Sequence, residues 1–174
     1  MKETDIKQAG DPVLREVSKS VSKDQINSPE IKRIIADMKS ALHDTEDGVA
    51  IAAPQIGKSV RIFVVSGVVF ATEESPESED MIFVNPEIVS TSKKKITLDE
   101  GCLSVRGRYG KIERSVQATV KALDEYGDAF QLGASGLLAQ IFQHETDHLD
   151  GVLFIDKATD VMDVPAENKD ELNN

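Results

Sequence analysis

The stretch QHETDHLDG, Gln143 to Gly151, places two histidines four residues apart, with a glutamate directly after the first. On an α-helix, residues i and i+4 lie on the same face one turn apart, so His144 and His148 project side by side. Two imidazoles so arranged can bind one divalent ion, while Glu145 can reach a water beside that ion. A helix could also use these residues for ordinary hydrogen bonds and ion pairs. A third ligand elsewhere in the chain decides between the two interpretations.

The residues before this stretch predict that it lies on an apolar helix. Ser135 can cap the helix, and Asp150-Gly151 can end it. The apolar positions between these limits are Leu137, Leu138, Ile141, Phe142 and Leu149. Strand-like segments precede this late helix, and an element of that kind is usually the centre of an α+β domain. The sequence therefore predicts an α+β fold with sheets packed around the helix.

Another helix and several strands are predicted from the spacing of apolar residues and from the capping and turn residues that bound them. Ser28-Pro29 begins a predicted helix over residues 29–45, with apolar residues at spacings of three and four, and Asp47-Gly48 ends it. His43, near the end of that helix, is expected on the surface. Predicted strands cover residues 60–66, 81–85, 93–98 and 115–124. The acidic residues 71–80 predict an exposed loop. The tail from about residue 157 is polar with weak periodicity, and its last ten residues are predicted to be loose.

Length and charge limit the classes of function. The 174 residues suffice for a single domain over 1–174, with 40% hydrophobic and 29% charged residues. The net charge of −11 argues against direct binding of nucleic acid, which needs clustered Lys and Arg. A local basic run could still face an acidic substrate, or could be solvated strand charges. Its members are Arg106, Arg108, Lys111 and Arg114.

The cysteine content and the N-terminus indicate a compartment. Cys102 is the one cysteine, so no intrachain disulfide can form. The first ten residues lack the apolar core of a signal peptide, and no apolar run approaches the ~18 residues typical of a membrane span. We therefore expect a soluble, cytoplasmic protein with no membrane partner.

Cys102 is the candidate third ligand. It lies in DEGCLSVRG, 42 residues before His144. A lone cysteine is usually a small buried hydrophobe. However, two histidines and one cysteine give three protein ligands with an open fourth position, which is typical of a catalytic metal site. A structural zinc site would need four ligands, and the sequence offers no convincing fourth.

A third stretch, GVAIAAPQIG (48–57), is rich in small residues that allow a backbone to lie close to a substrate. The side-chain amide of Gln55 could donate a hydrogen bond to a developing oxyanion. Runs of Ala and Gly also serve tight packing, so this segment alone does not identify a site.

Together the three stretches resemble one family. GVAIAAPQIG, EGCLS and QHETDH are similar to the three ordered motifs of peptide deformylase, which removes the formyl group from the N-terminal methionine of new bacterial chains. The segments GDPVLREVSKSV near the N-terminus, FVNPEIV at 83–89 and HLDGVLFID at 148–156 also resemble family segments in their usual order. The resemblance covers residues from about 6 to 156.

The resemblance implies a role for each matching position. Cys102, His144 and His148 match the metal ligands, and Glu145 matches the catalytic acid and base. The oxyanion donors match Gln55 and the backbone N–H of Leu103. The implied fold has antiparallel sheets around the helix that carries HExxH. The family uses ferrous iron physiologically, and zinc, nickel or cobalt can occupy the same ligands; ligand softness alone does not choose among them.

The implied substrate is an N-formyl-methionyl nascent peptide, which includes chains still at the ribosome. Val49, Leu137 and Ile141 are candidate walls for the methionine side chain, and Gln140 can add a polar edge. Two residues depart from the family pattern. Ala50 stands where the first motif usually has glycine, close to the bound substrate, and Arg106 stands where proline is frequent.

Two alternatives stay open at this point. A non-catalytic protein of the same fold could bind metal or chain ends, but binding alone needs neither Glu145 nor Gln55. A peptide-cleaving HExxH protease would usually recruit a downstream Glu or His as third ligand, and Cys102 disfavours it. One neighbour is predicted separately: Asp147, turned away from Glu145, should pair with an arginine such as Arg114.

Overall fold

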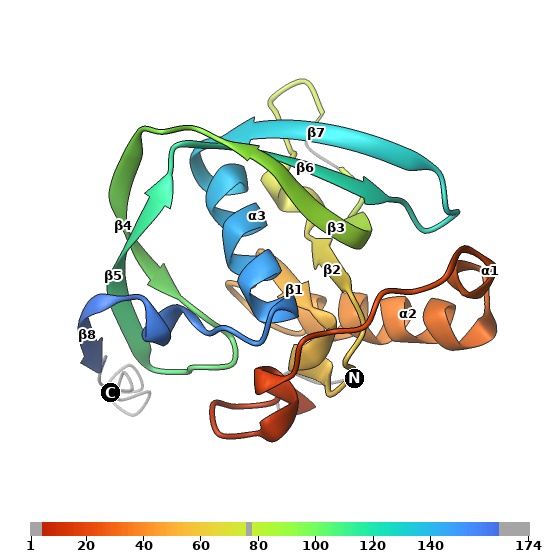
Figure 1. Ribbon diagram of the computed structural model, residues 1–174, viewed down its shortest axis with the longest axis horizontal. Helices are drawn as coiled ribbons and strands as arrows, with labels where there is room; N and C mark the ends of the chain where they lie inside the picture. The colour runs from red at the N-terminus through yellow and green to blue at the C-terminus, as the bar shows by residue number, and fades with distance from the viewer. Residues whose placement is uncertain (1–4, 76–77, 164–174) are drawn as a thin grey trace, which may run out of the picture.

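Two antiparallel sheets lie on either side of one central helix, α3 (Gly136–Leu149), in the computed structural model (Figure 1), which describes residues 5–75 and 78–163. The larger sheet has the order β1 (Ala50–Ala52), β2 (Ile62–Val65), β3 (Met81–Thr91), β6 (Gln117–Leu123) and β7 (Ala129–Ser135). The smaller has the order β4 (Lys95–Gly101), β5 (Arg108–Ser115) and β8 (Thr159–Asp163). Neighbouring strands are antiparallel throughout. The predicted α+β class with antiparallel sheets is confirmed.

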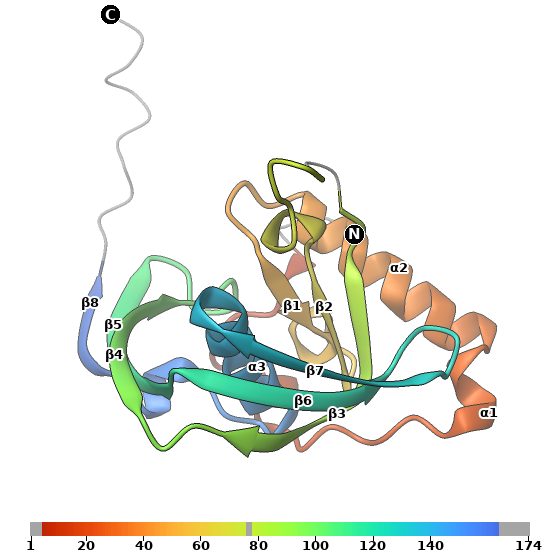
Figure 2. The same cartoon turned by 90° about the horizontal axis from the view of Figure 1, so that it is seen from above.

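Both faces of the larger sheet are covered. Successive side chains of a strand point to opposite faces. In β2, Ile62 and Val64 therefore join the cluster beneath α2 (Pro29–His43), whereas Phe63 and Val65 join the cluster beneath α3. The view from above (Figure 2) shows α2 and the smaller sheet at opposite ends of the molecule. The motif helix is thus held between two sheets.

The helix predicted over 29–45 begins as expected and ends slightly earlier. The Ser28 hydroxyl accepts a hydrogen bond from the Ile31 N–H, a cap worth about 1 kcal/mol. The helix ends at His43 with Asp44 as the C-cap, and the next N–H, on Thr45, donates to the Leu42 carbonyl three residues back instead of four. The predicted surface position of His43 is confirmed: its ring is exposed and contacts Asp80 at 2.8 Å.

Helix α3 has the predicted limits, with one difference at its start. Ser135 is the N-cap residue, but its side chain makes no capping hydrogen bond. Asp150 is the C-cap, and Gly151 follows with φ of 74°. A Cβ at Gly151 would lie 2.7 Å from the Arg15 carbonyl oxygen, so both backbone conformation and space require glycine.

Several strands differ from the prediction. The strand predicted over 81–85 continues through Pro86 to Thr91. A proline has no backbone N–H to donate, so it is disfavoured within a regularly paired strand. The pairing of β3 with β6 is irregular between Val84 and Glu87, and this accommodates the proline. Strands β1, β5, β7 and β8 were not predicted, and β8 lies at the start of the polar tail. The end of that tail, residues 164–174, lies outside the described residues.

Short elements complete the described chain. They are η2 (Pro12–Arg15), α1 (Lys23–Ile26), η3 (Ala53–Ile56), η4 (Gly67–Val69) and η5 (Phe154–Asp156). Within residues 5–75 and 78–163, none of the helices combines the length and the apolar character that crossing a membrane requires.

Candidate metal centre

The structure brings Cys102, His144 and His148 together. The two histidines project from consecutive turns of α3, and Cys102 follows directly after β4. Cys102 Sγ lies 3.2 Å from Nε2 of His148. One ligand atom from each residue lies within 4.8 Å of the other two. Residues 42 positions apart in the sequence thus converge on one point.

The hydrogen bond of the His144 imidazole determines which of its nitrogens is free. Nδ1 of His144 lies 2.6 Å from the Glu100 carboxylate, which leaves its Nε2 available to an ion. Nε2 of His148 faces the cysteine sulfur. A soft thiolate and two imidazoles form a donor set that suits zinc, iron, nickel or cobalt. The residues therefore fit a divalent ion with an open position for a substrate or water.

The Cys102 sulfur is held as a thiolate. Burial opposes ionisation, but the charge of His148 and hydrogen bonds with His144 and His148 outweigh it and lower the pKa of the thiol to about 5. The backbone N–H of Ser104 lies 3.4 Å from the sulfur, and the Gln55 amide nitrogen lies 3.7 Å from it. A thiolate is the form that binds a metal ion.

Glu145 is buried beside the ligands without being tied to them. The residue is 4% exposed, and its Oε2 has no hydrogen-bond partner within residues 5–75 and 78–163. Burial raises the pKa of this carboxyl, although the neighbouring His144 and His148 act in the opposite direction. A buried carboxyl with an unused oxygen and a raised pKa is suited to accept and release a proton.

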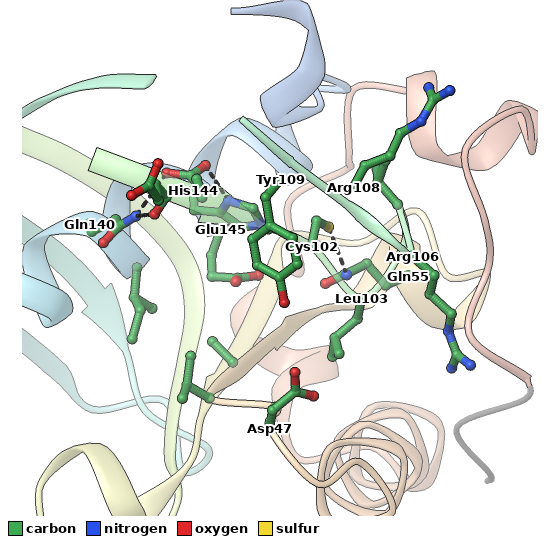
Figure 3. Close-up of a pocket in the computed structure, with 18 of the residues that line it drawn as sticks. Asp47, Gln55, Cys102, Leu103, Arg106, Arg108, Tyr109, Gln140, His144 and Glu145 are labelled. Atoms are coloured by element: carbon green, nitrogen blue, oxygen red, sulfur yellow. Dashed lines mark hydrogen bonds and ion pairs between the residues drawn. The ribbon is translucent and has the colours of Figure 1, made fainter. Parts of the chain in front are cut away.

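The Gln55 amide is fixed in one orientation. Gln55 lies in η3, and its Oε1 accepts a hydrogen bond from the Ala52 N–H at 2.8 Å. Its Nε2 consequently points toward Cys102 (Figure 3). The same nitrogen lies 3.2 Å from the Ser104 hydroxyl oxygen. An N–H donor therefore faces the centre, as the expected role of Gln55 requires.

A series of ion pairs, from Glu100 through Arg114 to Asp147, holds the His144 ring on the side of its Nδ1. The Glu100 carboxylate bonds both His144 and Arg114, the latter at 2.7 Å. Burial alone would raise the pKa of Glu100, but hydrogen bonds to His144 and Arg114 lower it to about 2. Arg114 also contacts Asp147 at 2.7 Å, so the predicted pairing of Asp147 is confirmed. Lys157 binds the other oxygen of Asp147.

This network corrects one interpretation of the basic run. Arg114 is 4% exposed and is committed to Glu100 and Asp147, so it is not part of an entry for an acidic substrate. Lys111 is paired with Asp99 at the surface. Arg106 and Arg108 do lie at the rim of the cleft (Figure 3), and Arg108 contacts Asp163 of β8.

A cleft of about 400 Å³ reaches Cys102, His144 and Glu145. Its apolar lining includes Val49, Ala50, Leu137 and Ile141, as expected. The backbone carbonyl of Asp99 and the carboxylate of Glu100 accept hydrogen bonds from the Gln140 amide, both at 3.2 Å, which fixes its polar edge. Leu103 lies on the opposite wall from Gln140, and Tyr109 lies across the cleft between them (Figure 3).

Comparison with known proteins gives the family. Residues 3–163 match the family model described as polypeptide deformylase. A peptide deformylase from Desulforudis audaxviator is 40% identical over 156 residues, which is 90% of this chain and 94% of that protein. One from Halothermothrix orenii is 43% identical over 153 residues, or 87% and 91% of the two chains. The chain belongs to the peptide deformylase family.

Solved structures of peptide deformylases agree. The Synechococcus elongatus enzyme in complex with actinonin has a TM-score of 0.79 and 36% identity, covering 89% of this chain and 80% of that one. The Acinetobacter baumannii class I type b enzyme with Met-Ala-Ser bound has a TM-score of 0.78 and 32% identity, covering 87% and 96%. The chain is a hydrolase of protein biosynthesis that removes the N-formyl group from nascent polypeptides.

Sequence reasoning missed two residues of this peptide deformylase site. Glu100 orients His144, and Ser104 contacts both Gln55 and the cysteine sulfur. Both lie two positions from Cys102. For Glu100, at the end of β4, the spacing of two was the available signal, because side chains two apart in an extended chain share a face. Ser104 lies in a turn closed by the bond from the Val105 N–H to the Cys102 carbonyl, so strand alternation offers no such signal for it.

Proposed function

We propose that Cys102, His144 and His148 together hold one divalent ion, ferrous iron in the cell, and that deformylation takes place beside it. The observation that carries the proposal is the convergence of the three ligand atoms within 4.8 Å. The unpartnered Oε2 of Glu145 next to them supports it. The choice of iron rests on the family resemblance, since the donor set also suits zinc, nickel and cobalt.

The residues around the ion divide the chemistry among them. A bound divalent ion supplies a Lewis acid and lowers the pKa of a water ligand to about 7. Glu145 accepts a proton from the attacking water and delivers it to the amine that leaves, so formate and a free N-terminus result. Gln55 Nε2 and the backbone N–H of Leu103 donate hydrogen bonds to the formyl oxygen as it becomes negative.

The apolar end of the cleft is proposed to receive the methionine side chain. Ile141 and Ala50 are buried there, and Val49 and Leu137 complete the walls. Gln140, held by Asp99 and Glu100, adds a polar edge. A Met-Ala-Ser peptide bound to the A. baumannii relative supports a peptide with N-terminal methionine as ligand of this fold.

The proposal extends to the cellular setting. Formylated N-termini belong to chains still being made, so we place the reaction in the cytoplasm, on chains at the ribosome. The net charge of −11 favours recognition of the peptide over contact with RNA. Ribosome pelleting with the purified enzyme, at low and moderate salt, measures this association.

The experiment that tests the proposal uses enzyme purified without oxygen. Iron, zinc, nickel and cobalt are measured per chain, and formate release is followed with formyl-Met-Ala-Ser and with the acetyl-Met-Ala-Ser control. We expect close to one iron per chain and formate release from the formyl peptide alone. Zinc in place of iron would overturn the choice of metal, and absence of formate release from metal-loaded enzyme would overturn the roles of the residues.

A further inference from the structure

The N-terminal segment (residues 6–9) forms hydrogen bonds with the two segments that carry the proposed oxyanion donors, one at Gln55 and one at Leu103 and Ser104. The Lys7 N–H donates to the Gln55 carbonyl at 2.8 Å, and the Ala9 N–H donates to the Ser104 carbonyl at 2.7 Å. Between these two bonds, the Gln8 side-chain amide donates to the Leu103 carbonyl at 3.0 Å. In Figure 1 this segment (red) runs beside η3, which contains Gln55.

We propose that Gln8 is a positioning residue for deformylation: it fixes the peptide group that joins Leu103 to Ser104. This inference rests on the proposed function. The carbonyl of that peptide group accepts the hydrogen bond from Gln8, and its N–H, on Ser104, lies 3.4 Å from the Cys102 sulfur. One rigid planar unit thus connects Gln8 to a metal ligand.

The planarity of the peptide group gives this contact its effect. Rotation of the unit would turn the Ser104 N–H away from the sulfur and would alter the backbone dihedrals at Leu103. The Leu103 N–H belongs to the preceding peptide unit and shares the Leu103 Cα, so its direction depends on the same dihedrals. Gln8 therefore acts on the sulfur and on the oxyanion donor without touching the substrate.

The Gln8 side chain is itself held in place. Its amide nitrogen also donates to the Ile6 carbonyl at 3.2 Å, so both amide hydrogens have acceptors. Ile6 is 4% exposed and packs in the cluster beneath α2, against which Leu103 also packs. Because both ends of the contact are anchored in one core, the bond to Leu103 is a fixed feature of the fold although Gln8 is at the surface.

The test compares Gln8→Leu, which keeps the size of the side chain but removes the donor, with Gln8→Lys, which keeps a donor. Gln131→Leu, at an exposed position of β7 remote from the site, is the matched control. For Gln8→Leu we expect kcat with formyl-Met-Ala-Ser to fall roughly three- to tenfold, the size of one net hydrogen bond, with KM unchanged. Gln8→Lys should recover most of this loss, and the control should match wild type.

A second measurement does not depend on turnover. Hydrogen exchange of the Ser104 amide, in metal-free and zinc-loaded protein, should be faster in Gln8→Leu and near wild type in Gln8→Lys, with equal Tm. Unchanged kcat and exchange in Gln8→Leu would overturn the inference, as would a lower Tm with unchanged kcat per bound metal. Gln55→Leu in the same assay separates the two proposals: if its kcat collapses while that of Gln8→Leu does not, only the inference about Gln8 fails. If Gln55→Leu retains full kcat, the proposed role of Gln55 fails.

Discussion

The end of the cleft around Cys102 and the end around Ala50 hold their side chains in different ways. Around Cys102, charged groups are joined to one another: Glu100 contacts His144 and Arg114, and Arg114 contacts Asp147. Around Ala50, the lining is aliphatic and is held by packing on the larger sheet. The ion pairs around Cys102 fix the orientation and protonation of the side chains there. The packing around Ala50 determines the shape of the cleft.

This difference predicts which property of the enzyme a substitution at each end of the cleft should change. Removing one partner of a buried ion pair costs about 3–5 kcal/mol, because the other charge is left without compensation. Removing one methylene-sized group from an apolar wall costs about 0.8 kcal/mol. Changes at the polar end should therefore alter metal binding and kcat, and changes at the apolar end should alter KM.

The largest effect is expected for Cys102→Ala. This change removes the thiolate and its negative charge, so two imidazoles remain to bind the ion. Stoichiometric metal and activity should both be lost, as measured by elemental analysis and formate release. Full metal content in this variant would show that Cys102 is not a ligand.

The second largest effect is expected for a change at Glu145, the proposed proton carrier, which should lower activity without removing the metal. Glu145→Gln keeps the size of the side chain but cannot accept a proton. General acid–base catalysis is worth ~10²–10⁴-fold, so kcat should fall by at least that range. Metal content should stay near one per chain, and Met-Ala-Ser should still bind. Loss of metal would instead make Glu145 a ligand or its support, and activity within a few-fold of wild type would mean that another group is the base.

An intermediate effect on stability and metal affinity is expected at Asp147, where the network of Glu100 and Arg114 reaches the surface of α3. Asp147 is 17% exposed and holds Arg114 and Lys157, so Asp147→Asn should weaken the support of Glu100 and hence of His144. We expect Tm to fall by several degrees and metal affinity to fall roughly tenfold, with kcat per bound metal retained. Asp150→Asn is the matched control, because Asp150 pairs with Arg61 at the exposed end of the same helix. A loss of catalysis with metal and Tm intact would contradict this assignment.

The sequence predicted that Cys102, His144 and His148 come together, because helical spacing and a lone cysteine are local signals. His144 and His148 share a face wherever the helix forms, and α3 formed as its apolar periodicity predicted. The contact between Glu100 and His144 joins residues 44 positions apart and depends on how β4 approaches α3. No local pattern specifies that approach, and the same holds for the bond from Gln8 to Leu103.

Two of the missed strands, β7 and β8, have a related explanation. Strand β7 contains Ala129, Gly133 and Ser135, which have little intrinsic preference for strands, and its hydrogen bonds come from pairing with β6. Strand β8 is exposed throughout and exists through its pairing with β5. Both are edge strands that depend on tertiary context, whereas β2, buried along its whole length, was predicted from its own residues.

The smallest effect is expected at the apolar end, for Ala50→Gly. Ala50 begins β1, is 8% exposed and lines the cleft where the family usually has glycine. A methyl group facing a bound peptide backbone forces it outward, so glycine should lower KM for formyl-Met peptides a few-fold and leave kcat unchanged. Glycine in a strand also costs about 0.5–1 kcal/mol of stability, and Ala118→Gly in β6 controls for that cost. If kcat/KM is unchanged while both variants lose similar stability, Ala50 is neutral for the substrate, and the cleft accepts alanine without narrowing.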